Sequence, residues 1–315
     1  MSLNGSRVMV TGGAGFLGRQ VVAEFRRHGV TNLIVPRRKE VDLTRQDSVE
    51  QLIAEVQPEI VVHLAAEVGG IGANRENPGR YFYANITMGL NVIEASRVEG
   101  VSKVVQVGTV CSYPKLTPVP FVEDDLWNGY PEETNAPYGI AKKSLLTMLQ
   151  AYRDQYGFNG IYLIPVNLYG PGDNFDHSSS HVIPALIRRF VSARDAGDTS
   201  VTVWGTGAAS REFLYVDDAA TAIVKATFDY DDPDPVNVGS GDEIRVRDLV
   251  TKVAKLAGFD GEVEWDTSKP DGQPRRKLNT ERAERLFGFK AGIGLDVGLK
   301  KTIEWWEQTL DSKER

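Results

Sequence analysis

A tyrosine and a lysine four residues apart, Tyr138 and Lys142, form the pair in this sequence best suited to proton transfer. They follow Pro137, which fits the first turn of a helix because proline has no N–H to leave unpaired there. Residues four apart lie on one face of a helix, and an ammonium group beside a phenol favours the phenolate. We therefore expect Lys142 to lower the pKa of Tyr138, so that Tyr138 transfers a proton near neutral pH. Surface helices carry the same pair by chance, so this interpretation depends on the rest of the chain.

A second chemical feature is a glycine-rich turn with the spacing G-x-x-G-x-x-G. It follows a short apolar run, residues 7–10, and precedes a helical pattern that begins at residue 16. Glycine lets the backbone approach a pyrophosphate, and the start of a helix attracts its negative charge. A flexible turn is the alternative, but the flanking strand and helix favour a dinucleotide site. The expected contacts are Gly12, Gly15, Phe16, Leu17 and Gly18.

The loop after the second expected strand, residues 32–35, indicates which dinucleotide is bound. An acidic residue here would bind a ribose 2′-hydroxyl and select NAD. This chain has Arg37 and Arg38 instead, and guanidinium groups match the oxygens of a 2′-phosphate. The loop therefore favours NADP(H), with a solvated basic loop as the alternative. Asp42 could accept a hydrogen bond from the adenine amino group.

A hydroxyl and a thiol follow the fourth expected strand, residues 104–107, at Thr109 and Cys111. Catalytic groups of open parallel sheets lie beyond the carboxyl ends of the strands, so both are candidates. Cys111 could instead be a small buried apolar residue. His63 lies inside an apolar run, and we expect it to be packed in the core.

These groups must be positioned by alternating strands and helices. Strands are expected at 60–66, 104–107 and 161–166, and helices at 48–56, 81–97 and 137–156. With the two N-terminal units, this pattern predicts an α/β fold, a Rossmann-type doubly wound parallel sheet. We expect an NADP-binding domain at 1–168, to which the chain returns at about 212–238. A smaller C-terminal α/β substrate domain is expected at 169–315.

The composition excludes several classes of protein. The net charge of −7 argues against a nucleic-acid-binding surface. No run of eighteen apolar residues is present, so we expect no membrane span. A single cysteine cannot form an internal disulfide and suits a reducing, cytoplasmic location. We expect no metal site.

The glycine spacing and the Tyr138–Lys142 pair, on a chain of this length, resemble the extended short-chain dehydrogenase/reductase family. Longer strings resemble those members that act on GDP-linked 4-keto-6-deoxy sugars. These strings are residues 68–71, 111–115, 167–171, 180–186, 203–205, 211–214 and 268–272. The resemblance implies NADPH-dependent epimerisation of GDP-4-keto-6-deoxy-D-mannose at C3 and C5, followed by reduction at C4 to GDP-L-fucose.

The resemblance also implies roles for individual residues. Cys111 would be the base and His181 the acid of epimerisation, and a cation near the thiol would favour its thiolate. His177 is the alternative acid, but the string that continues from His181 favours the latter. Tyr138, with Lys142, would protonate O4. Thr109 would hydrogen-bond the ketone oxygen, at a position where the family has serine.

The resemblance further implies ligand contacts. Additional cofactor contacts would be Leu64, Ala65, Ala66, Val107, Gly108, Pro165, Asn167 and Leu168, together with Tyr138, Lys142 and His181. Substrate contacts would be Arg189, Trp204, Arg211, Asp271 and Arg276. Trp204 could stack on guanine or lie in the core, and Lys277 is the alternative to Arg276. A homodimer through helices near 81–97 and 137–156 is also expected.

Three alternatives differ in their chemistry. A GDP-sugar 3,5-epimerase would cycle its cofactor without net redox, which the two arginines at 37 and 38 disfavour. A 4-reductase of a related GDP-4-keto-6-deoxy sugar or heptose would not need both Cys111 and His181. A non-catalytic NADP-binding regulator would need none of the catalytic residues.

Overall fold

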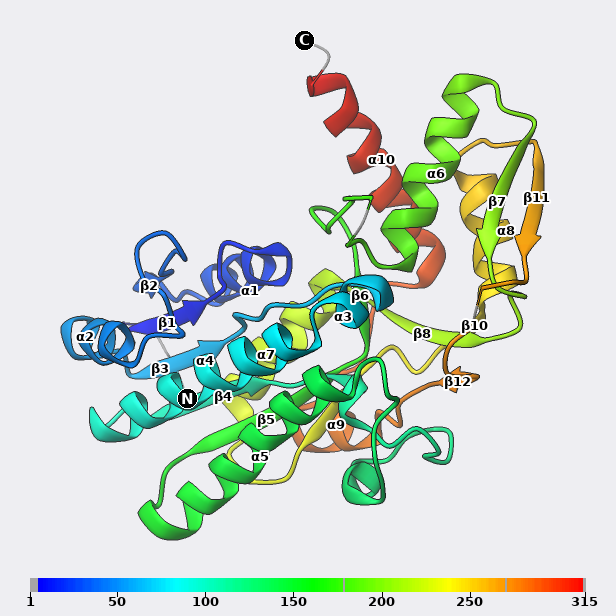
Figure 1. Ribbon diagram of the computed structural model, residues 1–315. Coiled ribbons are helices and arrows are strands. Elements are labelled where there is room, and N and C mark those ends of the chain that lie inside the picture. Colours follow the sequence, from blue (N-terminus) through cyan, green and yellow to red (C-terminus); the bar gives the residue numbers. More distant parts are fainter. Residues whose placement is uncertain (1–4, 178, 270, 314–315) are drawn as a thin grey trace.

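A six-stranded parallel sheet forms the centre of the protein (Figure 1). The computed structural model describes residues 5–177, 179–269 and 271–313, so Ser178 and Pro270, the latter within the 268–272 string, lie outside the described residues. The strand order is β2-β1-β3-β4-β5-β9. The strands are β1 Val8–Thr11, β2 Leu33–Ile34, β3 Ile60–His63, β4 Lys103–Val107, β5 Gly160–Pro165 and β9 Val236–Val238. This order confirms the predicted doubly wound α/β fold.

Helices cover both faces of this sheet, which explains why every residue of β1, β3 and β4 is buried. The helix α4 packs against α2 and α5, whereas α1 packs against α7 (Figure 1). These helices are α1 Phe16–Arg27, α2 Gln46–Val56, α4 Pro78–Val98, α5 Ala136–Tyr156 and α7 Val216–Asp229. Pro137 lies in the first turn of α5, as its position in the sequence predicts. His63 is fully buried in β3, where its Nδ1 atom lies 2.7 Å from the Thr11 hydroxyl.

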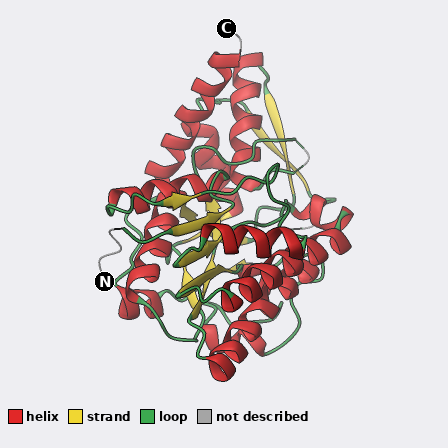
Figure 2. Cartoon of the chain, turned by 90° about the vertical axis from the view of Figure 1, so that its left-hand side faces the viewer, coloured by secondary structure: helices red, strands yellow, loops and turns green. Residues whose placement is uncertain are grey.

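A second hydrophobic core lies in the C-terminal half, which forms the narrow upper part of Figure 2. It is built mainly from three helices and a parallel strand pair: α6 Val182–Ala196, α8 Val246–Leu256, α10 Leu295–Lys313, β7 Ser200–Trp204 and β11 Glu262–Asp266. A small sheet joins the two halves and contains β6 Asn167–Tyr169, β8 Ser210–Tyr215, β10 Glu243–Arg245 and β12 Arg275–Arg276. The short helices α3 Ile71–Glu76 and α9 Glu281–Phe287 and the 3-10 helices η1 Val110–Ser112 and η2 Glu123–Trp127 complete the described fold. The domain boundary at residue 168 stays a prediction.

The chain crosses between the two halves more than once. In sequence, α7 and β9 come after the first elements of the second core. Even so, α7 packs on α1 and β9 pairs with β5, so α7 and β9 belong to the layers of the large sheet. Among the described residues, no helix is both long and apolar enough to cross a membrane.

Candidate active site

A cavity of about 1680 Å³ lies at the carboxyl edge of the large sheet, between that sheet and the C-terminal half. Its walls include the segments that follow β1, β3, β4 and β5, and residues of α6, β7 and β12. Single drug-sized ligands occupy roughly 300–1,000 Å³, so this cavity has room for a dinucleotide and a second nucleotide together. Every site residue predicted from the sequence lines it. Their individual roles stay predictions.

The glycine turn is shaped for close approach by a ligand. Gly12 has a positive φ of 70°, and a Cβ atom there would lie 2.8 Å from the backbone nitrogen of Ala65. A Cβ at Gly18 would overlap the Gly12 carbonyl. Gly15 caps α1 and contributes no side-chain hydrogen bond, so the first N–H groups of the helix have no side-chain cap. This geometry fits a dinucleotide pyrophosphate at the start of α1.

The basic loop lies at the far end of the same cavity. Arg37 and Arg38 are exposed, and Arg38 forms an ion pair with Glu67 at 2.8 Å. Glu67 also accepts a hydrogen bond from Arg80 at 2.7 Å, and these arginines, Arg80 first, lower its pKa. The sequence analysis missed Glu67, which fixes the orientation of Arg38. Asp42 accepts hydrogen bonds from Thr44, which lower its pKa.

Tyr138 and Lys142 project from α5 and are both buried. Burial raises the pKa of Tyr138, the nearby Cys111 thiol adds to this effect, and a hydrogen bond with Thr109 opposes it. The prediction of a lowered Tyr138 pKa is therefore wrong, because loss of hydration is the largest influence on this phenol. Burial also lowers the pKa of Lys142 to about 8. Among the described residues, none forms a hydrogen bond with its ammonium group, which lines the cavity and fits a polar ligand.

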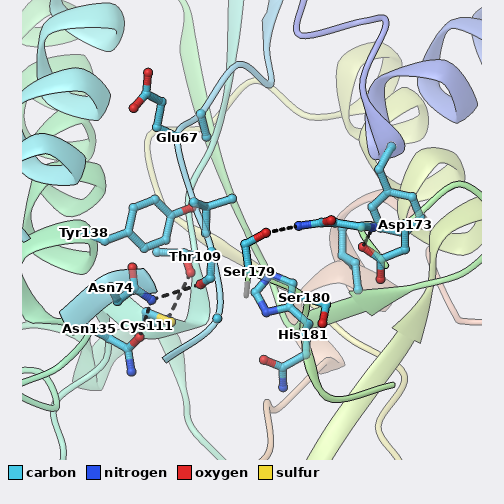
Figure 3. Close-up of a pocket in the computed structure, with 18 of the residues that line it drawn as sticks. Glu67, Asn74, Thr109, Cys111, Asn135, Tyr138, Asp173, Ser179, Ser180 and His181 are labelled. Atoms are coloured by element: carbon cyan, nitrogen blue, oxygen red, sulfur yellow. Dashed lines mark hydrogen bonds between the residues drawn. The ribbon is translucent and has the colours of Figure 1, made fainter. Parts of the chain in front are cut away.

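Thr109 and Cys111 follow β4. Thr109 immediately precedes the short helix η1 Val110–Ser112, and Cys111 lies within it. The Thr109 hydroxyl accepts a hydrogen bond from the Cys111 backbone N–H at 3.2 Å. Gly139 allows α5 to approach this turn, because a Cβ there would overlap the Cys111 carbonyl. The Ser112 hydroxyl donates to the Gly139 carbonyl at 2.9 Å. These contacts bring Tyr138 and Cys111 together on one wall of the cavity (Figure 3).

His181 lies across the cavity from Tyr138 and Cys111 (Figure 3). It caps α6, and its segment contacts the 68–70 loop through the Gly70 N–H, which donates to the Ser179 carbonyl at 3.1 Å. His181 is exposed as a residue, yet burial by the surrounding protein lowers the pKa of its imidazole. His177 lines the cavity as well, so geometry alone keeps both histidines as candidates.

The predicted substrate contacts gather at the C-terminal wall. Trp204 is 65% exposed, which rules out the core interpretation, and the Lys269 ammonium lies 5.6 Å from its ring centroid. Arg189 donates to the Thr202 carbonyl at 2.7 Å. Arg211 donates to the Gln273 carbonyl at 2.6 Å, while the Asp271 carboxylate accepts from Thr206.

Arg276, by contrast, lies at the thiol. Its Nη1 atom is 3.7 Å from the Cys111 Sγ, and its other donors bind Gln273. The neighbouring Arg275 pairs with Glu243, and Lys277 is not part of the cavity wall. The cavity therefore favours Arg276 over Lys277 as the basic residue of this loop.

Two further groups escaped the sequence analysis. Asn74 is buried in the cavity wall and donates to the Asn135 side chain at 3.1 Å, and its own carbonyl oxygen is unpaired among the described residues. Burial raises the pKa of Asp173 to about 7, and within the described part of the chain its Oδ2 atom has no hydrogen-bond partner. Neither belongs to a pattern that single-sequence reasoning singles out.

Comparison with known proteins places the chain in a family. Residues 8–239 match the model of the NAD dependent epimerase/dehydratase family. The chain belongs to this family. It is 41% identical over 312 residues to "Probable GDP-L-fucose synthase 1" of Oryza sativa subsp. japonica, covering 99% of this chain and 95% of the relative.

Two solved structures share the whole fold. One, a GDP-6-OMe-4-keto-L-xylo-heptose reductase from C. jejuni, has a TM-score of 0.91 at 29% identity, covering 98% of this chain and 99% of the other. The second is a GDP-L-fucose synthetase from Naegleria fowleri bound to NADP. Its TM-score is 0.90 at 26% identity, and the match covers 98% of this chain and 96% of the other.

Proposed function

We propose that this protein is an NADPH-dependent enzyme that converts GDP-4-keto-6-deoxy-D-mannose to GDP-L-fucose. One observation carries the proposal: Cys111, Tyr138 and His181 surround a single cavity in a chain 41% identical to a relative named for GDP-L-fucose synthesis. Epimerisation at C3 and C5 requires an acid and a base on opposite faces of the sugar. Reduction at C4 requires a proton donor at O4.

The chain's own residues fit a bound NADP(H). The turn at Gly12 and the uncapped start of α1 would hold the pyrophosphate, and Arg37 and Arg38 would bind the 2′-phosphate. The unpartnered Lys142 ammonium would donate hydrogen bonds to the ligand near Tyr138. When bound, NADPH supplies the hydride that C4 receives. The 2′-phosphate contacts favour NADP(H) over NAD(H).

The proton transfers follow from the positions of three side chains. The C4 ketone acidifies the hydrogens at C3 and C5; the Cys111 thiolate takes each proton to become a thiol, and the electron pair moves onto O4 as an enolate. His181 returns a proton to the carbon from the opposite face. Before the second centre reacts, the Cys111 thiol releases its proton to solvent and His181 takes one up from solvent. Thr109 and Tyr138 hydrogen-bond O4 during these steps. Because burial keeps the Tyr138 phenol protonated at neutral pH, Tyr138 can give its proton to O4 in the reduction.

We also propose a cytoplasmic homodimer. Apolar side chains are exposed along α4, at Phe82, Tyr83 and Leu90, and Tyr156 is exposed at the end of α5. The two helices pack on each other, so their outer faces form one surface. Pairing this surface with a second copy would bury these side chains in a four-helix interface.

The test follows cofactor and substrate together. Protein, NADPH and GDP-4-keto-6-deoxy-D-mannose are mixed in heavy water, nicotinamide absorbance is recorded, and the product is analysed by NMR. Cofactor oxidation with deuterium at C3 and C5 is expected. Oxidation without deuterium would instead support a 4-reductase, like the heptose reductase that shares this fold. Deuterium without oxidation would indicate an epimerase. The absence of both cofactor oxidation and deuterium would overturn the proposal.

A variant then ties the exchange to its base. Cys111→Ser is expected to abolish deuterium incorporation at C3 and C5 while leaving NADPH binding unchanged. Because Cys111 is the only cysteine in the chain, no other thiol can substitute for it. Normal exchange in this variant would remove Cys111 from its role.

A further inference from the structure

Two residues of the C-terminal segment form an unusual contact with the Cys111 thiol. Arg276 lies on β12, is only 9% exposed, and places Nη1 at 3.7 Å from the thiol sulfur. Gln273 accepts hydrogen bonds from Arg276 Nε at 3.2 Å and Nη2 at 3.1 Å. One amide oxygen thus occupies one edge of the guanidinium and directs its remaining nitrogen at the sulfur.

Gln273 is itself fixed to the segment that carries the thiol. Its amide nitrogen donates to the Lys115 carbonyl at 2.9 Å, across 158 residues of sequence. Lys115 lies four residues beyond Cys111 on the wall formed by the large sheet. Gln273 therefore holds Arg276 and the Cys111 segment in one arrangement, although the two come from opposite halves of the protein.

The charge of Arg276 is not neutralised by its protein surroundings. Within the described part of the chain, no carboxylate forms an ion pair with it, and its anchor Gln273 is a neutral amide. A second guanidinium, that of Arg211, is half-buried nearby: burial and then the charge of Arg276 lower the pKa of Arg211 to about 10, while the charges of Asp271, Cys111 and Glu132 oppose this shift. Within the described residues neither guanidinium forms a salt bridge, and a cation 3.7 Å from the sulfur favours a negative charge on it.

We propose that Arg276 stabilises Cys111 as its thiolate and that Gln273 positions Arg276 for this task. The base of the epimerisation is then activated by a residue from the C-terminal half, and only when that half is docked on the sheet. Gln273 is suited to this because an amide orients a guanidinium without cancelling its charge. The inference rests on the proposed function only for what the thiolate does, since the thiolate itself can be measured without any sugar.

The test uses Cys111 as its own probe, since it is the only thiol in the chain. The rate of alkylation by iodoacetamide is measured from pH 5 to 10 by intact mass, on the full-length protein. Only the thiolate reacts, so the pH at which alkylation reaches half its maximal rate, the midpoint, is compared between the wild-type protein and each variant. Arg276→Met is expected to raise this midpoint by about 1–3 pH units, and Arg276→Lys is expected to restore part of the shift.

Gln273→Glu separates charge from packing. It keeps acceptors for Arg276 but adds a negative charge, so the midpoint is expected to rise although the fold is preserved. Arg275→Met is the matched control, because Arg275 is exposed, pairs with Glu243 and is expected to leave the midpoint unchanged. If neither Arg276→Met nor Gln273→Glu moves the midpoint while Cys111 still reacts, the inference is overturned.

The outcome also separates this inference from the proposed function. Thermal unfolding verifies that each variant is folded before its alkylation is compared. A shifted midpoint together with loss of deuterium exchange at C3 and C5 supports both proposals. A shifted midpoint in a protein whose wild type shows no exchange supports the role of Arg276 and contradicts the epimerase function.

Discussion

Lys142 is a buried ammonium group whose desolvation lowers the free energy of unfolding. Its pKa is about 8 in the folded protein and 10.5 for an ordinary lysine. Below about pH 8 both states are charged, so the folded state carries the full desolvation penalty, at most about 3 kcal/mol. Between about pH 8 and 10.5 the unfolded chain binds more protons, so rising pH removes the penalty. Such a group, unfavourable for folding, is typical of a site built for a ligand.

Replacing this ammonium should therefore stabilise the protein. Lys142→Met is expected to raise the free energy of unfolding at pH 7 by up to about 3 kcal/mol, with the difference shrinking as pH rises past 8. Urea unfolding at pH 7 and 9.5 measures it. Lys143→Met is the control, because Lys143 is also buried on α5 but donates to the Leu126 carbonyl at 2.8 Å, so its loss should destabilise. A Lys142→Met variant that is less stable than wild type at pH 7 would contradict this argument.

At the scale of elements, the contact between η1 and the start of α5 fixes the cavity wall that carries Cys111 and Tyr138. Gly139→Ala would place a methyl group against the Cys111 carbonyl and force the two elements apart. We expect a loss of about 1–3 kcal/mol in unfolding free energy and a larger loss of deuterium exchange, because Cys111 and Tyr138 would separate. Urea unfolding and the exchange assay measure both effects.

The control for this substitution is another helical glycine. Gly79 lies in the first turn of α4, and a Cβ there meets nothing within 4 Å. Gly79→Ala is expected to be neutral or slightly stabilising, since alanine favours a helix by about 0.5–1 kcal/mol over glycine. Equal effects of the two substitutions would show that contact with η1 is unimportant.

The elements also show what the sequence can predict. Continuous apolar runs correctly predicted the buried strands β3, β4 and β5, and Pro137 correctly predicted the start of α5. The small joining sheet was not predicted, because β12 has only two residues and its partner β8 lies more than sixty residues away. Local pattern carries no information on such pairings.

The same limit applies to the site. Residues after strand ends and in fixed spacings, such as Thr109 and the glycine turn, could be placed from sequence because the topology brings strand ends to one edge. The contact of Arg276 with Cys111 spans 165 residues, and that of Gln273 with Lys115 spans 158. Such contacts depend on how the two halves dock. The predicted direction of the Tyr138 pKa shift was wrong for a related reason: the spacing of Tyr138 and Lys142 does not reveal that the phenol is buried.

At the scale of the whole molecule, charge is distributed unevenly. The chain carries a net charge of −7, yet lysines and arginines outnumber aspartates and glutamates among the residues that line the cavity. A positively charged cavity in a protein of negative net charge focuses the electric field and attracts negatively charged ligands. NADPH and a GDP-sugar are both anions, so their binding should depend on ionic strength.

The Michaelis constants of both ligands are therefore expected to rise with salt, while kcat changes little, because the field acts on association rather than on groups already in contact. Between about 0.01 M and 1 M salt the Debye length falls from roughly 30 Å to 3 Å, which screens the cavity from the approaching ligand. Steady-state kinetics across this range measure the effect. Arg189→Gln removes one charge from the C-terminal wall and should weaken the salt dependence for the GDP-sugar more than for NADPH. Michaelis constants independent of salt would show that contacts inside the cavity, and not its overall field, determine binding.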